Sequence, residues 1–396
     1  STLSVRGGCA SPRGPDGTPP GSSTSHRSPG RPGRRGRHGR PGPRGPGINS
    51  VRDVLAEFPA VLNAEGHLPP ATHSVLHRIV TAGHPVTAKF RRLDNDKLAA
   101  AKAEFQKLEE EGIIRRSSSC WASPLHMVKK GDGSWRPCGD YRRLNLLTEP
   151  DCYPLPNMTD ITARLAGCTV FSKLDLKKGY HQIPVLPADV AKTAIITPFG
   201  LFEYLRMPFG LKNAGMTFQR FMDQIFGDLP FTIVYLDDIL VASKDLESHR
   251  THLREVLSRL QQHGLVLNIE KSEFCRSSVD YLGLHVTADG TTPLQDQAAA
   301  IREFPQPATI KDLQGFLGLV NFYRRYIPGA AKLLLPLTNC LKGGSPGSTQ
   351  LEWHADMLHA FHLVKEALVS PPCLAHPVDG ARPVSYTHLR AHETKA

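Results

Sequence analysis

The sequence predicts an α+β fold, because strand-like and helical stretches are mixed along the chain without a repeating βα unit. The chain has 396 residues, long enough for about two or three domains with a sizeable core. No apolar run approaches the ~18 residues that a membrane helix needs. No signal-peptide-like segment opens the chain either, so we expect no membrane partner.

Residues 1–47 form a basic leader rich in Gly, Pro, Ser and Arg, with nine Arg and one Asp. Such a composition cannot bury a core and predicts disorder. The leader has +8 of the chain's net charge of +11, so any nucleic-acid surface elsewhere must come from local clustering. Two interpretations stay open: an RNA-binding arm, or a non-native leader translated upstream of the true frame, which we favour.

Regular structure is expected from about Ile48 onwards. The stretch 94–112 predicts a helix that Asp94 or Asn95 can cap and Gly112 can end. The same signals of periodicity and turn residues predict the later elements. These are hairpins over 127–138 and 195–207, strands over 170–176 and 281–287, and helices over 213–226, 246–263, 309–326 and 353–369. The eight cysteines form no CxxC pair and no cluster at zinc spacing, which predicts reduced thiols.

The segment 232–243, TIVYLDDILVAS, places Asp237 and Asp238 where two short apolar strands would meet at a tight turn. Taken alone, it fits a plain hairpin turn and a metal site equally well, although Asp-Asp is a poor hairpin turn. Asp175 ends a further apolar strand, FSKLDL. Three crowded carboxylates repel one another unless a cation is bound, and magnesium prefers such oxygen ligands. Two such ions would support an in-line phosphoryl transfer.

The stretch KKGDGSWR supplies Lys129, Lys130 and Arg136 around one hairpin turn. An Arg can hold a phosphate with two hydrogen bonds, and Lys acts as a point charge, so these cations could bind a triphosphate. The alternative is a solvated hairpin with ordinary surface lysines, which for the loop alone is the favoured interpretation.

Eight sequence blocks occur in one order. They are EEEGIIRRSSSCWASPLHMVKK (109–130), WRPCGDYRRLN (135–145), YPLP (153–156), FSKLDLKKGYHQIPV (171–185), KTAIITPFGLFEYLRMPFGLKNAGMTFQRFMD (192–223), YLDDILVAS (235–243), YLGLHVTADG (281–290) and FLGLVNFYRRYIP (316–328). With these blocks the chain resembles, from about Asp53 to Pro383, the reverse transcriptase in the Pol polyprotein of gypsy-type long-terminal-repeat retrotransposons.

The resemblance implies a right-hand polymerase fold with fingers, palm and thumb, followed by a connection segment. We expect fingers and palm over 48–290, and thumb and connection over 291–383 with a truncated lead-in to RNase H. The tail 384–396 does not fit the family and is expected to be foreign. The implied activity is an RNA-directed DNA polymerase that extends a primer with deoxynucleoside triphosphates on an RNA or DNA template.

The resemblance also assigns roles to residues. Asp175 and Asp237 would be the main ligands of two Mg²⁺ ions, with Asp238 a weaker partner and Mn²⁺ an alternative metal. The nucleotide would be bound by Lys129, Lys130, Arg136, Tyr180 and Phe209; the supporting residues would be Asp140, Arg142 and Tyr235; the primer grip would be Tyr281, Leu282 and Gly283. Tyr180 would exclude the 2′-hydroxyl of ribonucleotides, although plain core packing also explains a Tyr at this position.

The implied partners are an RNA or DNA primer–template, deoxynucleotides and other domains of a Pol polyprotein, at work in a cytoplasmic virus-like particle. Gly215 departs from the Pro or Ala usual in the family and is expected to loosen the pocket. Two alternatives stay open. One is a truncated remnant that binds primer–template but turns over poorly, and the other is a different two-metal enzyme such as a nuclease.

Overall fold

The computed structural model describes residues 46–62, 68–129, 131, 133–157, 162–343, 346–369 and 371–376. The expected tail 384–396 and residues 1–45 of the expected leader lie outside this part. Helix α1 (Pro46–Ala56) opens it, so regular structure begins two residues before Ile48, and α2 (Pro59–Leu62) follows.

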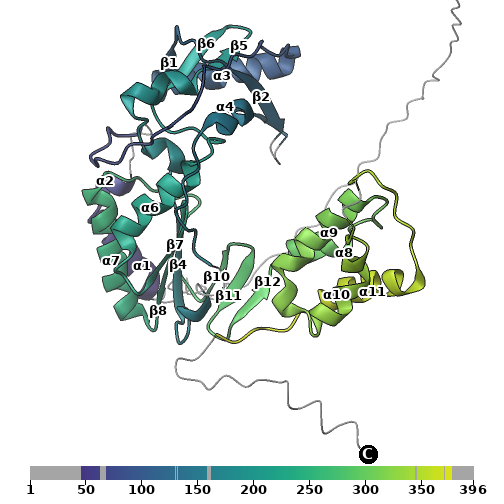
Figure 1. The fold of residues 1–396 in the computed structure, drawn as a ribbon. Helices are drawn as coiled ribbons and strands as arrows, with labels where there is room; N and C mark the ends of the chain where they lie inside the picture. The colour runs from purple at the N-terminus through teal and green to yellow at the C-terminus, as the bar shows by residue number, and fades with distance from the viewer. Residues whose placement is uncertain are drawn as a thin grey trace, which may run out of the picture. The chain divides into compact units, whose positions relative to one another are not determined.

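A five-stranded sheet in the order β1-β6-β5-β2-β3 occupies the first part of the fold (Figure 1). Its strands are β1 (Ile114–Arg116), β2 (Ser123–Lys129), β3 (Trp135–Gly139), β5 (Ile195–Thr197) and β6 (Gly200–Tyr204). Helix α3 (Asn95–Glu110) contacts β3 and β1, and the short α4 (Arg142–Leu147) follows β3. The two predicted hairpins are therefore present, and the second ends three residues earlier than expected.

Helix α3 confirms the predicted start and stop signals. The carboxylate of Asp94 accepts a hydrogen bond from the backbone N–H of Lys97 at 2.9 Å, and Gly112 follows the helix with φ +67°. Ala101, Phe105 and Leu108 are buried on one face of the helix, while Leu98 is only half-buried.

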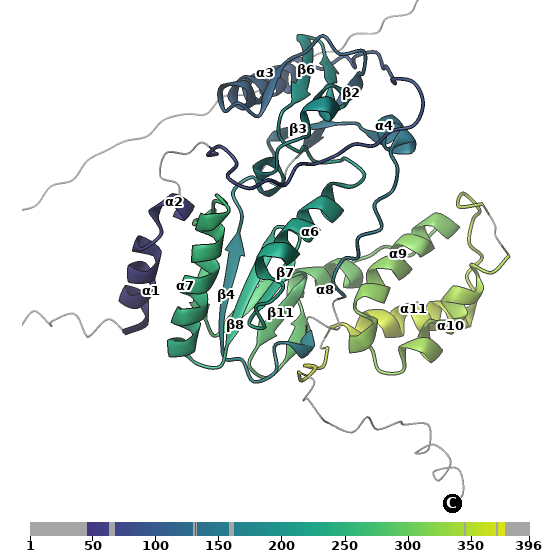
Figure 2. The same ribbon diagram turned by 60° about the vertical axis from the view of Figure 1, so that its left-hand side comes forward.

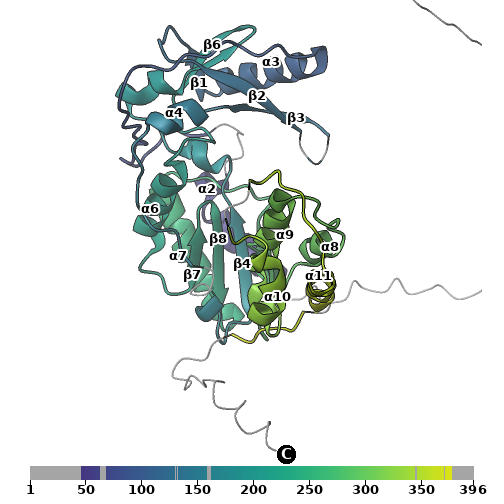
Figure 3. The same cartoon turned by 45° about the vertical axis from the view of Figure 1, so that its right-hand side comes forward.

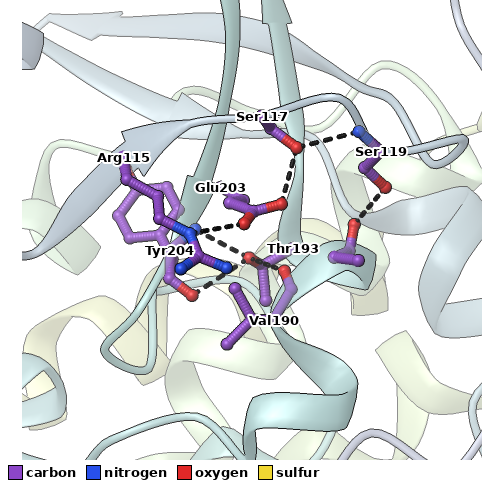
Figure 4. A network of polar contacts seen from close by, with 8 residues as sticks. Arg115, Ser117, Ser119, Val190, Thr193, Glu203 and Tyr204 are labelled. Atoms are coloured by element: carbon purple, nitrogen blue, oxygen red, sulfur yellow. Dashed lines mark hydrogen bonds and ion pairs between the residues drawn. The ribbon is translucent and has the colours of Figure 1, made fainter.

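A network of polar contacts fixes the β1–β6 edge of this sheet (Figure 4). The carboxylate of Glu203 accepts hydrogen bonds from Arg115 Nε at 2.7 Å and from Ser117 Oγ at 2.6 Å. Next to it, the backbone N–H of Tyr204 donates to Thr193 Oγ1 at 2.8 Å. The network holds the end of β6, and the backbone that follows this strand contacts the candidate site described below.

The central sheet has the order β7-β8-β4-β9, and every pair in it is antiparallel. Its strands are β7 (Thr232–Tyr235), β8 (Asp238–Ser243), β4 (Val170–Asp175) and β9 (Glu273–Arg276). Helices α6 (Ala214–Phe226) and α7 (Leu246–Gln262) pack beside it (Figure 2). The two apolar faces belong to different cores, because side chains alternate along each strand. Leu174, Val234, Ile239 and Val241 share a core with both helices, whereas Phe171, Ile233 and Leu240 pack with Val279, Tyr281 and Val286.

The expected strand over 281–287 is wrong in one respect, because it is broken by a turn. Strands β10 (Ser278–Tyr281) and β11 (Leu284–Thr287) pair around Leu282 and Gly283, both of which have positive φ, +48° and +80°. A third strand, β12 (Thr291–Pro293), completes the small sheet.

Four helices form a separate core in the last part of the chain (Figure 3). They are α8 (Gln295–Arg302), α9 (Ile310–Phe322), α10 (Ala330–Asn339) and α11 (Ala355–Ala367). The helix expected over 309–326 ends at Phe322 and continues as a 3₁₀ turn, η3 (Arg324–Tyr326). Thr309 and Asp312 form a reciprocal capping box at its start. Within the described residues, no helix has the length and apolar character needed to span a membrane.

Candidate active site

Asp175 and Asp238 lie directly opposite each other at the ends of β4 and β8. Side chains of directly paired residues project from the same face of an antiparallel sheet, so the two carboxylates share a face with Tyr235, which pairs with Asp238 on the other side. The tight turn is Leu236–Asp237 rather than the expected Asp237–Asp238. Leu236 has φ +56°, a conformation that non-glycine residues rarely adopt.

Burial disfavours the charged forms of two of the acids, Asp175 and Asp238, although lysines lie nearby. Burial raises the pKa of Asp175, an effect that nearby Lys271 opposes and Asp237 adds to. Burial also raises the pKa of Asp238, again with a contribution from Asp237. Carboxylates in this state gain from a bound cation. Nevertheless, no three His, Cys, Asp or Glu side chains converge as a ligand group in the part of the chain described here.

A cavity of about 530 Å³ brings several predicted residues together. Of the residues assigned from the sequence, Arg136, Asp175, Phe209 and Asp237 line it. Sequence reasoning missed further lining residues of positive charge, which are Lys177, Lys178 and Lys271. Lys129, Tyr180 and Asp238 are not among the residues that line the cavity.

The β2–β3 hairpin, which carries the cations predicted to bind a triphosphate, places Lys129 and Arg136 on opposite faces. Arg136 pairs with Val128, and Lys129 pairs with Trp135. Because neighbouring positions on a strand face opposite sides, the side chains of Lys129 and Arg136 leave opposite faces of the hairpin. Lys130 lies outside the described residues.

Asp140 and Arg142 form the expected contact directly after β3. The Asp140 carboxylate accepts hydrogen bonds from Arg142 Nε at 2.7 Å and Nη2 at 2.6 Å, and from Arg91 Nη2 at 2.6 Å. The Arg142 guanidinium, helped by Arg91, holds the pKa of Asp140 well below its usual range. Sequence reasoning missed Arg91, which lies outside the family blocks.

Tyr180 lies on a 3₁₀ turn, η1 (Gly179–Gln182), that follows β4. Its ring packs edge-on against Phe209 with centroids 4.8 Å apart and contacts Phe218 at 5.3 Å. Burial, with the neighbouring Asp237, raises the pKa of Tyr180 to about 12. The ring is thus partly packed in the core and lies beside an acid of the site, so both earlier interpretations of Tyr180 agree with its position.

The side chain of Gln219 in α6 holds the turn between β7 and β8, a role that the sequence analysis did not predict. This fully buried side chain of α6 accepts a hydrogen bond from the Leu236 N–H at 2.8 Å. Its amide donates to Asp223 Oδ1 at 2.9 Å and to the Val234 carbonyl at 3.3 Å. Tyr153 in turn donates to Asp223 Oδ2 at 2.8 Å. The only sequence signal was a polar residue within the apolar face of a helix.

Tyr281 links the β10–β11 turn to the acids. Its hydroxyl donates a hydrogen bond to the backbone carbonyl of Asp238 at 3.1 Å. On the other side of this turn, the Gly283 carbonyl accepts a hydrogen bond from Tyr323 Oη at 3.1 Å. The turn that contains Leu282 therefore connects the site to the residue that follows α9.

Comparison with known proteins agrees with this geometry. Residues 128–286 match the family described as "Reverse transcriptase (RNA-dependent DNA polymerase)". The chain is 36% identical over 335 residues to the retrovirus-related Pol polyprotein from transposon 297 of Drosophila melanogaster, covering 83% of this chain and 31% of that protein. It is 38% identical over 282 residues to the transposon Tf2-3 polyprotein of Schizosaccharomyces pombe, covering 71% and 21%. The chain thus spans a third or less of the length of these curated relatives.

Solved structures show the same fold at lower sequence identity. The foamy viral protease–reverse transcriptase in complex with double-stranded DNA superposes with a TM-score of 0.75 at 21% identity, over 84% of this chain and 70% of that one. The same enzyme with an RNA/DNA hybrid gives a TM-score of 0.72 at 21% identity, over 83% and 44%. These likenesses confirm the predicted α+β polymerase fold. Together, the family match over residues 128–286 and the similarity to the curated relatives identify in this chain a reverse transcriptase domain of the kind found in retrotransposon Pol polyproteins.

Proposed function

We propose that this chain is an RNA-directed DNA polymerase that extends a primer with deoxynucleotides on an RNA or DNA template. The observation that supports this most directly is the cavity in which Asp175 and Asp237 lie together with Arg136 and Phe209. Carboxylates, a guanidinium and an aromatic ring in one cavity are what a nucleotide with its metal ions requires.

The donor set fits divalent metal. Asp175 and Asp237 line the cavity, and the pKa values of Asp175 and Asp238 are raised mainly by burial and partly by the charge of Asp237. A bound cation would favour the charged forms of these carboxylates. In the proposal Asp175 and Asp237 are the main ligands of two Mg²⁺ ions, Asp238 is a weaker ligand, and Mn²⁺ can substitute. When bound, such ions stabilise the charge that develops on the transferred phosphoryl group.

The chain's own groups position the substrates. Arg136 neutralises the triphosphate, with Lys129 or Lys130 as a second cation, and the Asp140–Arg142 contact holds the end of β3. Tyr180 and Phe209, packed edge to face, form the floor of the sugar site and leave no room for a 2′-hydroxyl. Tyr281, Leu282 and Gly283 hold the primer terminus, and Tyr235 supports the acids from β7.

Partners and organisation are proposed from the relatives. The foamy viral enzymes were solved with double-stranded DNA or an RNA/DNA hybrid, which supports primer–template as the nucleic-acid partner. We propose fingers and palm over 48–290, thumb and connection over 291–383, and action beside other Pol domains in a cytoplasmic virus-like particle.

The test is primer extension on an RNA template with a DNA primer, deoxynucleotides and Mg²⁺. Wild type should extend the primer, and Asp237→Asn should lose about a hundredfold or more of this activity. Equal extension by both proteins would contradict the site assignment. If neither protein extended a primer–template that both still bind, the result would favour the alternative of a truncated remnant that binds primer–template but turns over poorly.

A further inference from the structure

The turn between Asp175 and Tyr180 contains an ion pair whose role the polymerase motifs do not explain. Lys178 is the residue before η1 and has φ +53°, in the left-handed region that non-glycine residues rarely occupy. Its ammonium forms an ion pair with Glu111, the residue that caps the C-terminus of α3. The two residues are 67 positions apart in sequence.

This pair is largely removed from solvent. The side chain of Glu111 is 5% exposed and that of Lys178 is 26% exposed. Buried ion pairs contribute little net stability compared with apolar side chains of similar size, because both charges lose their hydration. The pair is therefore better explained by the conformation that it imposes than by the stability that it adds.

Backbone hydrogen bonds show which segments are held together with the Lys178–Glu111 pair. The Leu205 N–H donates to the carbonyl of Ile113, two residues after Glu111, at 2.8 Å. The Met207 N–H donates to the Ile183 carbonyl at 2.8 Å, directly after η1. The Lys178–Glu111 pair closes this ring of contacts, so that η1 is fixed at its start by the ion pair and at its end by the backbone after β6.

The residues within the held turn are those of the sugar site. Gly179 packs against Asp237, and Tyr180 packs against Phe209. The His181 ring bonds the Met207 carbonyl at 3.1 Å, and the His181 N–H donates to the Lys178 carbonyl at 2.7 Å. A turn released at Lys178 would let the Tyr180 ring move relative to Asp237.

We propose that the Lys178–Glu111 pair is a positioning pair that fixes the Tyr180 turn and thereby sets the discrimination between deoxynucleotides and ribonucleotides. The inference rests on the proposed polymerase function. It differs from the Tyr180 assignment in placing part of the specificity in an ion pair that holds the Tyr180 turn. Lys178 also lines the cavity, and the ratio of the two nucleotide affinities cancels any loss of binding that both nucleotides share.

The test replaces both charges by neutral side chains of similar length, Lys178→Met with Glu111→Met. Removing both charges leaves no unpaired buried ion, so this double variant should stay folded. The control is Arg254→Met with Glu57→Met, because this ion pair also joins two residues far apart in the sequence and lies in neither η1 nor the backbone after β6. The charge-reversed variant, Lys178→Glu with Glu111→Lys, tests rescue.

The readout avoids turnover by using a complex with a dideoxy-terminated primer on its template. We measure the affinities of the next correct deoxynucleotide and of its ribonucleotide, and take their ratio. The neutral double variant should reduce the ratio of deoxynucleotide to ribonucleotide affinity by about tenfold. An apolar site that fits its substrate closely rejects an added hydroxyl by roughly a hundredfold, so this is a partial loss of discrimination. The control should keep the wild-type ratio, and charge reversal should restore it.

Three results would overturn the inference in distinguishable ways. If the neutral double variant kept the wild-type ratio while Tyr180→Ala lost discrimination, the ion pair would have no role in specificity, but Tyr180 would still exclude ribonucleotides. If Tyr180→Ala discriminated as well as wild type, Tyr180 would not exclude ribonucleotides, and the inference about the ion pair would fail with that assignment. If wild type bound neither nucleotide, the proposed function itself would fail, and the inference with it.

Discussion

Gly179 and Asp237 are in such close contact that a β-carbon built on Gly179 would lie 2.9 Å from Cβ of Asp237. Contacts this short do not occur between real side chains, so Gly179→Ala must displace the turn that contains Asp237. We expect kcat for primer extension to fall by about 10- to 100-fold, the usual effect of an ångström-scale misplacement. Single-turnover extension at saturating deoxynucleotide measures it.

The control for this variant is Gly215→Ala, on the other side of the same turn. A β-carbon there would lie 3.5 Å from Leu236 Cδ2 and 3.8 Å from Tyr180 Oη, which are ordinary contacts. The change should raise the free energy of unfolding by about 0.5–1 kcal/mol, because Ala favours the helix over Gly, and should not lower kcat. A similar loss of kcat in both variants would show that crowding at Gly179 is not the cause.

Gln219→Met should weaken the catalytic turn from the side of α6. The substitution leaves the Leu236 N–H without its acceptor and should cost about 1–3 kcal/mol of stability, measured by urea unfolding. It should also lower kcat, because Leu236 keeps its unfavourable φ only while the turn is held. Gln224→Met on the exposed face of the same helix is the control. Full activity in Gln219→Met would contradict the role of this hydrogen bond.

Arg136 and Lys129 should differ in their effect on nucleotide affinity, because they leave opposite faces of the β2–β3 hairpin. Arg136→Ala should raise KM for deoxynucleotides by about 10- to 100-fold, as expected from the loss of a charge-assisted hydrogen bond. Lys129→Ala should raise it by less than about fivefold, the range of an exposed charge. Steady-state kinetics on one template separates the two, and a larger effect of Lys129 would contradict the register argument.

Stability should fall in mild acid because three buried histidines stay neutral. Burial is the main cause that lowers the pKa of His77, His181 and His249 to about 4. Between this value and the ordinary pKa of about 6.5, the unfolded chain binds more protons than the folded one, so the free energy of unfolding decreases as pH falls. The full loss is up to about 3 kcal/mol for each histidine.

The comparison that isolates one histidine is His249→Gln against wild type. His249 is fully buried and contacts Ser172 Oγ at 2.7 Å and Ser243 Oγ at 2.8 Å. In chemical unfolding between pH 7 and 4, the variant should show a pH slope smaller by about one proton. An identical slope would mean that His249 does not titrate on unfolding.

Local signals in the sequence were sufficient for about half of the elements, whereas α1, α8, α10 and several short strands were not predicted. The helix over 95–110 and the strand over 170–175 have caps, periodicity and turn residues that agree with one another. The β10–β11 turn was missed because Leu282 adopts positive φ, which its residue type does not favour. The register of the β7–β8 turn was missed by one residue for the same reason, since Leu236 rather than Asp238 occupies the turn.

Only the site residues that belong to sequence motifs were predicted. Asp175 and Asp237 were identified by their strands and by the family blocks, and they line the same cavity. Gln219, Arg91 and Glu111 were missed because their roles come from tertiary contacts with residues far along the chain. No periodicity or spacing encodes such contacts.

The position of β4 in the middle of the central sheet has a consequence for biosynthesis. Its two neighbours, β8 and β9, both come later in the chain, with α6 and α7 also made after it. A nascent chain that has emerged only as far as β4 therefore has an apolar strand with two unpaired edges. The sheet can close only after Arg276 has left the ribosome, which makes folding dependent on distant contacts, slow, and open to aggregation of incomplete chains.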